Sequence, residues 1–312
     1  MDSYQRLLVV VDEHDFSLKG IARALYMASR TTNASIIVML LEHGSFVSRL
    51  VDTFEHGNEA DTGEGLNGHS TQMSLDKKRH CITQFIQTNR QNGLSISQAS
   101  ISCHSCDDVL SFCEDFKVDT IFIAASRHKL WNWLTIKALD TRLVRESPRP
   151  VVVVKDHLWE PGGRILSLVD PCNNGEDEQA LNKKVLQTAE HFTRLLKGYC
   201  HLLDCYYGET PSISFHQSVS PEGDEQYHFE RLSRYSSEYH LLPDRSLKAR
   251  EYCHLVKELP EDAIESLSKK VDSELVIIGD KGTSSFFSNL CGHAADQVID
   301  RINCDLLVVK PQ

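Results

Sequence analysis

The sequence predicts an α/β protein built from two tandem domains, each with a parallel sheet at its centre. The first observation is that short aliphatic runs alternate with helical patterns along the 312 residues, which is typical of strand–helix–strand units. The second is that the latter half of the chain repeats the former in the same order and with nearly the same spacing. Since an average domain has roughly 150 residues, one duplicated domain accounts for the chain.

The predicted strands are continuous runs of β-branched and aliphatic residues, a pattern that favours strands buried on both faces. They lie at 7–11, 36–41, 121–124 and 151–154 in the first half, and at 165–169, 201–206, 275–278 and 306–309 in the second. Helical patterns separate them at 21–30, 107–116, 178–196, 263–270 and 294–302. The alternation predicts βαβ units and a parallel sheet.

Three matched segments carry the duplication: 9–12 with 167–170, 118–123 with 271–276, and 150–155 with 305–310. They predict a first domain at 1–157 and a second at 158–312, joined by a segment around Pro161 and Gly162. This join is too short to be a flexible tether, so we expect the halves to pack together. Insertions at 44–70 and 208–226, rich in Gly, Asn, Pro and acidic residues, are predicted to be mobile loops.

Charge and composition exclude several classes of function. The formal charge of −11 argues against a surface for nucleic acid or anionic membrane, because such partners recruit basic patches. The sequence contains no apolar run of about 18 residues, which a membrane helix needs, and no signal-peptide pattern. We therefore expect a cytoplasmic protein whose ten scattered cysteines are mostly small buried apolar residues. Cys103 and Cys106 form a C-x-x-C pattern that we interpret as structural packing.

Glycines after the predicted strand 275–278 indicate a binding site for an anion. In an open parallel sheet, ligands bind beyond the C-terminal ends of the strands, where the strand order reverses. Gly279 and Gly282 have no Cβ, so their backbone amides can approach a phosphate closely. Gly292 then precedes a helix whose first amides favour an anion, and Lys281 adds a donor. The alternative is that these glycines serve only a sharp turn.

The spacing of these glycines, G-x2-G-x9-G, resembles that of the ATP-binding universal stress proteins. Three further features match: Asp170 closes a strand, Leu-Leu-x-x-Tyr ends another strand at 202–206, and Pro260 begins the helix before the strand 275–278. Because the duplication covers nearly the whole chain, the protein resembles a tandem universal stress protein, closest to the E-type branch.

This resemblance implies that each domain is a five-stranded parallel sheet flanked by helices, a Rossmann-like fold of the adenine nucleotide alpha hydrolase type. It implies that the second domain binds ATP or another adenine nucleotide, with no metal beyond nucleotide-bound Mg²⁺. Carried over by position, Asp170 faces the nucleoside and Cys205 lines the adenine pocket. The phosphates are then surrounded by Gly279, Lys281, Gly282, Gly292, His293 and Ala294. His293 departs from the family pattern, which has Ser or Thr at this position.

The first half departs further from the motif. Its equivalent stretch is 124–133, and no glycine occurs between Gly93 and Gly162. Side chains therefore stand where amides would meet phosphate, so we predict that the first half does not bind ATP. It supports the second half or holds another ligand, with the basic residues at 127–129 as candidate anion contacts and Trp131 and Trp133 as packing residues.

Three functions remain open. The first is a stress-response regulatory protein that binds ATP or another phosphorylated small molecule and acts through unknown regulatory partners. The second is a slow nucleotide-hydrolysing enzyme that engages Asp170, Lys281 and His293, and the third is a partner-binding module without a ligand. No catalytic residue is predicted, because the sequence has neither G-x-S-x-G nor a Walker phosphate loop. We expect a compact monomer in which 151–154 pairs with 306–307 as an internal pseudo-dimer, with a homodimer as the alternative.

Overall fold

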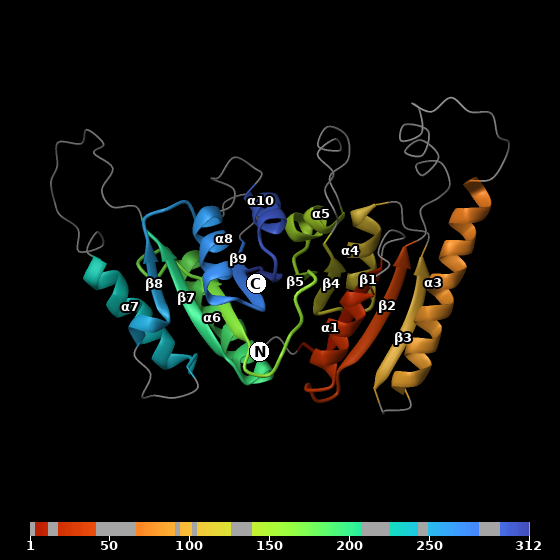
Figure 1. Ribbon diagram of the computed structural model, residues 1–312, viewed down its shortest axis with the longest axis horizontal. Helices are drawn as coiled ribbons and strands as arrows, with labels where there is room; N and C mark the ends of the chain where they lie inside the picture. Colours follow the sequence, from red (N-terminus) through yellow and green to blue (C-terminus); the bar gives the residue numbers. More distant parts are fainter. Residues whose placement is uncertain are drawn as a thin grey trace, which may run out of the picture. The chain divides into compact units, whose positions relative to one another are not determined.

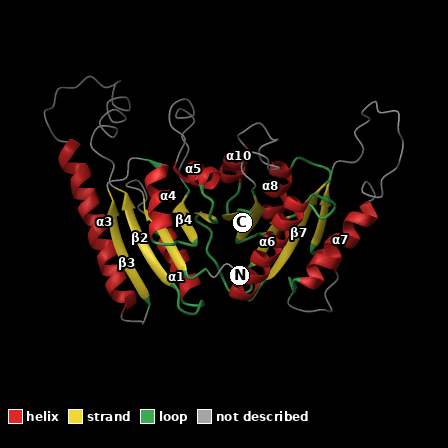
Figure 2. Ribbon diagram, turned by 180° about the vertical axis from the view of Figure 1, so that it is seen from behind, coloured by secondary structure: helices red, strands yellow, loops and turns green. Residues whose placement is uncertain are grey.

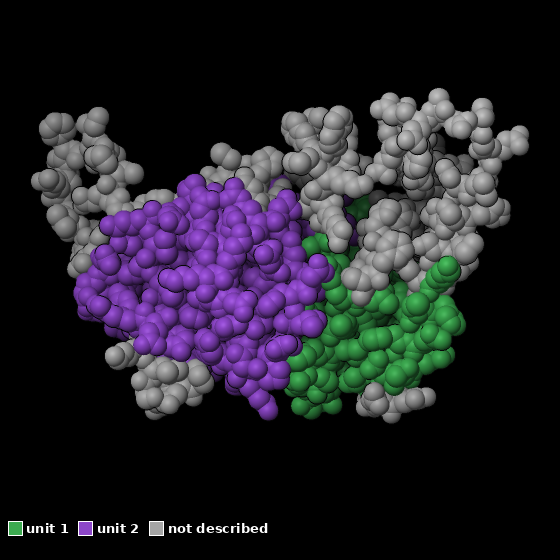
Figure 3. All heavy atoms as spheres, viewed as in Figure 1, with its two compact units in different colours: residues 1–126 green, residues 127–312 purple. Residues whose placement is uncertain are grey.

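The computed structural model describes residues 4–11, 18–41, 67–90, 94–101, 105–125, 139–206, 225–242, 249–280 and 294–311. The chain forms two compact units, Met1–Ser126 and Arg127–Gln312 (Figure 3). The boundary between these compact units, after Ser126, differs from the predicted boundary between the sequence repeats, after residue 157. The reason is β5 (Val151–Val154), which belongs to the first repeat in sequence and forms its ladder with a strand of the second.

The first unit contains a parallel sheet whose described strands follow the order β3-β2-β1-β4 (Figure 1). These strands are β1 (Arg6–Val11), β2 (Ser35–Leu41), β3 (Ser95–Ile101) and β4 (Thr120–Ala124). Its described helices are α1 (Lys19–Ala28), α3 (Asn67–Arg90) and α4 (Cys106–Asp115). Helix α1 packs on β1, β2 and β4, while α3 packs on β3.

The second unit contains the strand order β5-β10-β9-β6-β7-β8. The strands that follow β5 in the chain are β6 (Arg164–Leu168), β7 (Tyr199–Cys205), β8 (Cys253–Val256), β9 (Leu275–Gly279) and β10 (Asp305–Val309). All ladders are parallel except the one between β5 and β10, which is antiparallel and aligns Leu306 with Val153. The predicted pairing of 151–154 with 306–307 is therefore confirmed.

Helices flank the strands of this unit as well (Figure 2). They are α5 (Leu139–Glu146), α6 (Glu176–Leu196), α7 (Glu225–Glu238), α8 (Pro260–Val271) and α10 (Ala294–Arg301), with a 3-10 turn at Ala249–Glu251. Helix α6 packs on β6, β7 and β9, and α7 packs on β7 and β8. Within the described part of the chain, no helix is long and apolar enough to cross a membrane.

The predicted α/β class and all predicted strands and helices are confirmed, with end points that differ by a few residues. Strands β3 and β8, and helices α3, α5 and α7, were not predicted. The prediction of loops at 44–70 and 208–226 is wrong at their ends, because α3 already begins at Asn67 and α7 at Glu225. Residues 44–66 and 208–224 lie outside the described residues.

Two lysines at the ends of matching strands tie helices and strands together in the second unit. Lys155 follows β5, and its ammonium donates to the carbonyl of Ile299 in the last turn of α10. Lys310 follows β10, and its ammonium donates to the carbonyl of Arg145 in the last turn of α5, at 3.4 Å. Each lysine thus places a positive charge at the negative end of a helix dipole, and each links elements of the two sequence repeats.

Close packing at the start of β6 and β7 depends on Gly198. A Cβ at this position would lie 1.8 Å from the carbonyl oxygen of Gly163. The same oxygen accepts a hydrogen bond from the N–H of Tyr199 at 3.2 Å. Nearby, the buried Trp159 packs edge-on against Phe192 of α6, with ring centroids 5.6 Å apart. The predicted join between the repeats is therefore a packed connection.

The edge strand β8 is held to β7 by a contact between two imidazoles. Nδ1 of His201 lies 2.9 Å from Nε2 of His254, so one ring donates to the other. Burial, followed by the charge of its neighbour His254 and of Arg164, lowers the pKa of His201 to about 4. Burial and the charge of Lys270 lower the pKa of His254 to about 4. The folded protein therefore favours neutral imidazoles.

We expect Gly198→Ala to lower the free energy of unfolding by about 3 kcal/mol or more, since a new methyl would overlap a backbone atom that cannot swing away. Gly175→Ala is the matched control. Its added Cβ would meet two side-chain atoms, Oδ1 of Asn173 at 3.2 Å and Cγ of Glu178 at 3.9 Å, and we expect a loss of about 1 kcal/mol or less. Urea denaturation measures both. Equal losses would contradict the packing assigned to Gly198.

We expect His201 and His254 to make the protein less stable as the pH drops from about 7 towards about 4, against the opposite effect of Asp204, whose raised pKa favours the folded state in acid. His201 and His254 take up protons near their ordinary pKa only when the chain unfolds, so acid favours the unfolded state. A His201→Gln/His254→Gln variant should show a shallower decline in urea midpoint between pH 7 and 5. The exposed His80 gives the control, because His80→Gln should leave the pH dependence unchanged.

Candidate functional site

The strand order of the second unit reverses between β6 and β9. Strand β6 lies between β7 and β9, and Ser167 aligns with Ile277 across the β6–β9 ladder. The chain leaves these strands at Asp170 and Gly279, while Cys205 ends β7. Since the ladders are parallel, all three residues lie at the C-terminal edge of the sheet. The structure therefore brings these three predicted site residues to one edge.

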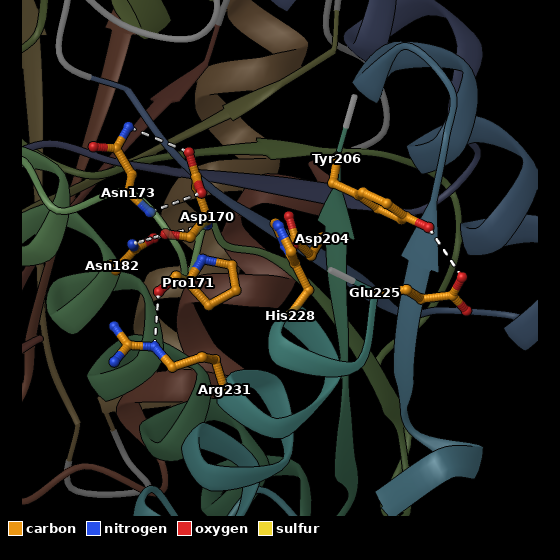
Figure 4. Close-up of polar contacts among 9 residues, drawn as sticks. All are labelled: Asp170, Pro171, Asn173, Asn182, Asp204, Tyr206, Glu225, His228 and Arg231. Atoms are coloured by element: carbon orange, nitrogen blue, oxygen red, sulfur yellow. Dashed lines mark hydrogen bonds and ion pairs between the residues drawn. The ribbon is translucent and has the colours of Figure 1, made fainter. Parts of the chain in front are cut away.

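Asp170 is anchored by two asparagines (Figure 4). Its backbone N–H donates to Oδ1 of Asn182 at 3.1 Å, and its carbonyl accepts from Nδ2 of Asn182 at 2.6 Å. Its carboxylate accepts from the backbone N–H of Asn173 at 3.2 Å and from Nδ2 of Asn173 at 3.3 Å. A carboxylate has about four acceptor positions, so Asp170 is held in place and keeps the capacity to accept from a ligand hydroxyl.

A buried ion pair that sequence reasoning missed lies beside Asp170. Oδ2 of Asp204, on β7, is 2.5 Å from Nδ1 of His228, on α7, and both side chains are buried (Figure 4). Burial raises the pKa of Asp204 to about 6, against the opposing effect of the hydrogen bond with His228. The ring of Tyr206 lies 5.1 Å from that of His228, and the Tyr206 hydroxyl donates to Glu225 at 3.2 Å. The pair thus fixes α7 against the end of β7.

Cys205 has an environment opposite to that of Asp204. Successive side chains of a strand point to opposite faces, so Cys205 points away from α7. Burial raises its pKa to about 12, with further contributions from the charges of Asp204, Glu258 and Glu261. The thiol therefore stays protonated. It can line an uncharged part of a ligand, but it is not an activated nucleophile.

Gly279 is required by packing as well as by its position at the edge. A Cβ on Gly279 would lie 2.6 Å from Cγ of Leu181, a buried residue of α6. The glycine therefore lets α6 lie close to the end of β9. This role differs from the sharp turn considered above. The next residue, Asp280, donates its backbone N–H to the carbonyl of Val309 at 2.8 Å.

A second buried ion pair follows Gly279. Nζ of Lys310, just after β10, lies 2.5 Å from Oδ2 of Asp280, and both side chains are buried. Lys310 thereby neutralises a carboxylate at the very edge where an anion is predicted to bind. The sequence repeat marks the lysine, because Lys310 matches Lys155, but it gives no sign of the partner Asp280.

The remaining predicted contacts lie largely outside the described residues. These are Lys281, Gly282, Gly292 and His293 of the second half, and Asp12, the basic residues 127–129, Trp131 and Trp133 of the first. Ala294 is the first residue of α10, where the sequence predicts the helix to start. Their roles as ligand contacts stay predictions.

Ladder register identifies the equivalent of the glycine site in the first repeat. Val9 aligns with Phe122 in the first unit as Ser167 aligns with Ile277 in the second. Two residues further along, Ala124 therefore stands where the second repeat has Gly279. The ladders thus shift the sequence match of 118–123 with 271–276 by two residues, so that Phe122 corresponds to Ile277 and not to Leu275. This register agrees with the predicted loss of the glycine motif from the first half.

A hollow in the first unit lies at the other edge of the sheet. It has a volume of about 470 Å³ and is lined by Ala22, Leu25, Tyr26, Ser29, Asn89 and Leu94. Leu94 precedes β3, so the hollow lies near the N-terminal ends of the strands, where parallel sheets do not usually bind ligands.

The C-x-x-C pattern and possible metal sites can be examined in the described part of the chain. Cys106 is the buried first residue of α4, behind a capping box formed by Ser105 and Asp108. Its burial favours the structural interpretation, while Cys103 lies outside the described residues. No group of three or more His, Cys, Asp or Glu among the described residues is arranged to hold a metal ion.

Comparisons with known proteins agree with this architecture. The chain is 24% identical over 324 residues to Universal stress protein E of Salmonella typhi, which covers 100% of this chain and 96% of the relative. It is 22% identical over 315 residues to the Universal stress protein E homolog of Haemophilus influenzae, covering 99% and 98%. No family model matches the chain.

A solved structure of a universal stress protein from Archaeoglobus fulgidus superposes with a TM-score of 0.67 at 12% identity, covering 100% of this chain and 98% of that one. A Pseudomonas aeruginosa structure assigned to the same family gives a TM-score of 0.69 at 18% identity, covering 99% and 94%. These full-length matches confirm the resemblance to tandem universal stress proteins of the E type, and the superpositions confirm the tandem fold.

We expect Gly279→Ala to destabilise the protein by about 1–3 kcal/mol, because the new methyl collides with Leu181. Leu181→Ala creates space at the same point, so the double variant should lose less stability than the two single losses added together. A coupling of about 0.5–3 kcal/mol is typical for residues in contact. Urea denaturation of the four proteins without ligand measures it. Additive losses would show that Gly279 is not required for the close packing of α6 through Leu181.

Proposed function

We propose that the chain is a stress-response regulatory protein that binds ATP or a related phosphorylated ligand in its second sequence repeat. The observation that carries the proposal is the convergence of Asp170, Cys205 and Gly279 on one edge, at the point where the strand order reverses. This is the usual ligand position in such sheets. The name shared by the full-length relatives supports the stress-response role.

The proposed ligand lies across the ends of β6, β7 and β9. Asp170 accepts from the sugar hydroxyls, Cys205 lines the base, and the phosphates lie among the residues from Gly279 to Ala294. Lys281, Gly282, Gly292 and His293 belong to this last group. Any metal is Mg²⁺ carried by the nucleotide. The repeats, 1–157 and 158–312, act as domains of unequal role, and the first has no nucleotide of its own.

The charges at this edge are compatible with an anion. Lys310 neutralises Asp280, which otherwise would repel a phosphate. Asp204 is hydrogen-bonded to the buried His228, so its carboxylate is partly satisfied within the protein. These two acidic groups therefore repel a phosphorylated ligand less than free carboxylates would.

The proposal treats the protein as a binding protein and not as an enzyme, with at most weak ATPase activity. There are two alternatives. One is an enzyme that hydrolyses the nucleotide slowly and engages Asp170, Lys281 and His293, and the other is a partner-binding module without a ligand. We further propose a cytoplasmic location, unidentified regulatory protein partners and a compact monomer joined by the β5–β10 ladder, with a homodimer as the alternative.

Native mass spectrometry of the freshly purified chain tests the proposal. We expect a retained mass equal to that of one adenine nucleotide or another phosphate ester, and calorimetric binding of ATP after that ligand is removed. Gly282→Val should abolish binding, because a branched side chain fills the space next to the phosphates. Arg127→Val, three residues after Ala124 as Gly282 is three after Gly279, is the matched control and should bind normally.

An empty chain that binds no nucleotide would contradict the proposal and favour the partner-binding module. Multiple-turnover ATP hydrolysis that is lost in both Gly282→Val and His293→Ala would instead favour the enzyme. Tight binding without turnover supports the regulatory protein.

A further inference from the structure

A buried glutamate near the end of β7 has an unused acceptor atom. Glu261, in the first turn of α8, is 8% exposed. Its Oε2 has no hydrogen-bond partner. Among the described residues of the second unit, no other buried carboxylate oxygen lacks a partner. Buried polar atoms are almost always paired. The atom therefore requires an explanation that the folded chain does not itself provide.

The other acidic residues of α8 show what an ordinary surface position looks like. Asp262 pairs with Arg301 of α10 at 2.5 Å, and Glu265 pairs with Lys269 at 2.7 Å. The side chain of Asp262 is 53% exposed and that of Glu265 is 32% exposed. Glu261 differs from them because it is buried, and its Oε2 accepts no hydrogen bond.

The position of Glu261 connects it with the proposed ligand edge. Its charge acts on Cys205, together with the charges of Asp204 and Glu258, and raises the thiol pKa. The carboxylate also lies in the first turn of a helix, where free amides and the helix dipole stabilise negative charge. Glu261 therefore lies close to Cys205, the residue proposed to line the base.

We propose that Glu261 accepts a hydrogen bond from the exocyclic amino group of the ligand's purine base. A carboxylate oxygen without a partner accepts hydrogen bonds, so the group that completes Oε2 is a donor, and the exocyclic amino group is the donor that an adenine base offers. This inference rests on the proposed nucleotide binding. It makes Glu261 a specificity-determining residue that distinguishes adenine from bases without an amino group at this position.

The test compares ATP with purine riboside 5′-triphosphate, which carries a hydrogen in place of the amino group. Calorimetry on the full-length chain, freed of bound ligand, gives the ratio of the two dissociation constants. A hydrogen bond to a charged group changes affinity by about tenfold or more, so we expect the wild-type protein to prefer ATP by at least about tenfold.

Two variants assign this preference to Glu261. Glu261→Ala should bring the ratio to within about twofold, and Glu261→Gln, which keeps a neutral acceptor, should give an intermediate ratio of about threefold. Glu258→Ala is the matched control, since it removes a nearby charge that also acts on Cys205. It should keep the wild-type ratio.

Equal affinity of the wild-type protein for the two nucleotides would overturn the inference without any variant. An unchanged preference in Glu261→Ala would also overturn it, because another group would then bind the amino group. If the wild-type protein binds neither nucleotide, the proposed function itself fails, and the inference fails with it. Circular dichroism confirms that each variant is folded.

Discussion

The reversal of strand order between β6 and β9 is the constraint on which the rest of the second unit depends. Because β7 and β9 lie on opposite sides of β6, the strand order reverses at this point, and the C-terminal edge there is where parallel sheets usually bind ligands. Asp170, Cys205 and Gly279 reach this edge only because every ladder among these strands is parallel. The packing below the edge serves the same arrangement, since Gly198 allows close contact at the start of the strands and Gly279 allows α6 to reach their end.

Charge is not distributed evenly along this edge. On the β9–β10 side, Asp280 is neutralised by Lys310 within the protein. On the β7–α8 side, Glu258 and Glu261 keep their acidic side chains close to Cys205. A nucleotide has the same division, because its phosphates are anionic and the amino group of adenine is a hydrogen-bond donor. The proposed orientation therefore places the anionic end of the ligand where the carboxylate is compensated, and the donor end where a carboxylate oxygen is free.

The sequence predicts the strands and the edge better than it predicts the pairings at the edge. Runs such as 151–154 are recognisable because every residue in them is buried and aliphatic. Strands β3 and β8 were missed because they are outer strands of their units and contain polar residues such as Gln98 and His254. Asp170 and Gly279 are predictable from the rule that parallel strands end together. The pairs Asp204–His228 and Asp280–Lys310, 24 and 30 residues apart in sequence, depend on which face of an element each side chain occupies in three dimensions.

The two repeats have kept the same framework and have diverged at the site. Lys155 and Lys310 occupy matching positions, and each binds the last turn of a helix from the other repeat. Lys310 also meets a carboxylate after the neighbouring strand, that of Asp280, which stands where the first repeat has Ala125. Likewise, Gly279 corresponds to Ala124. A framework contact that is retained in both halves indicates selection for the joined fold. A glycine and an acidic residue that stand at these positions in one half alone indicate a requirement local to that half, and a single ligand there is the simplest requirement that explains both.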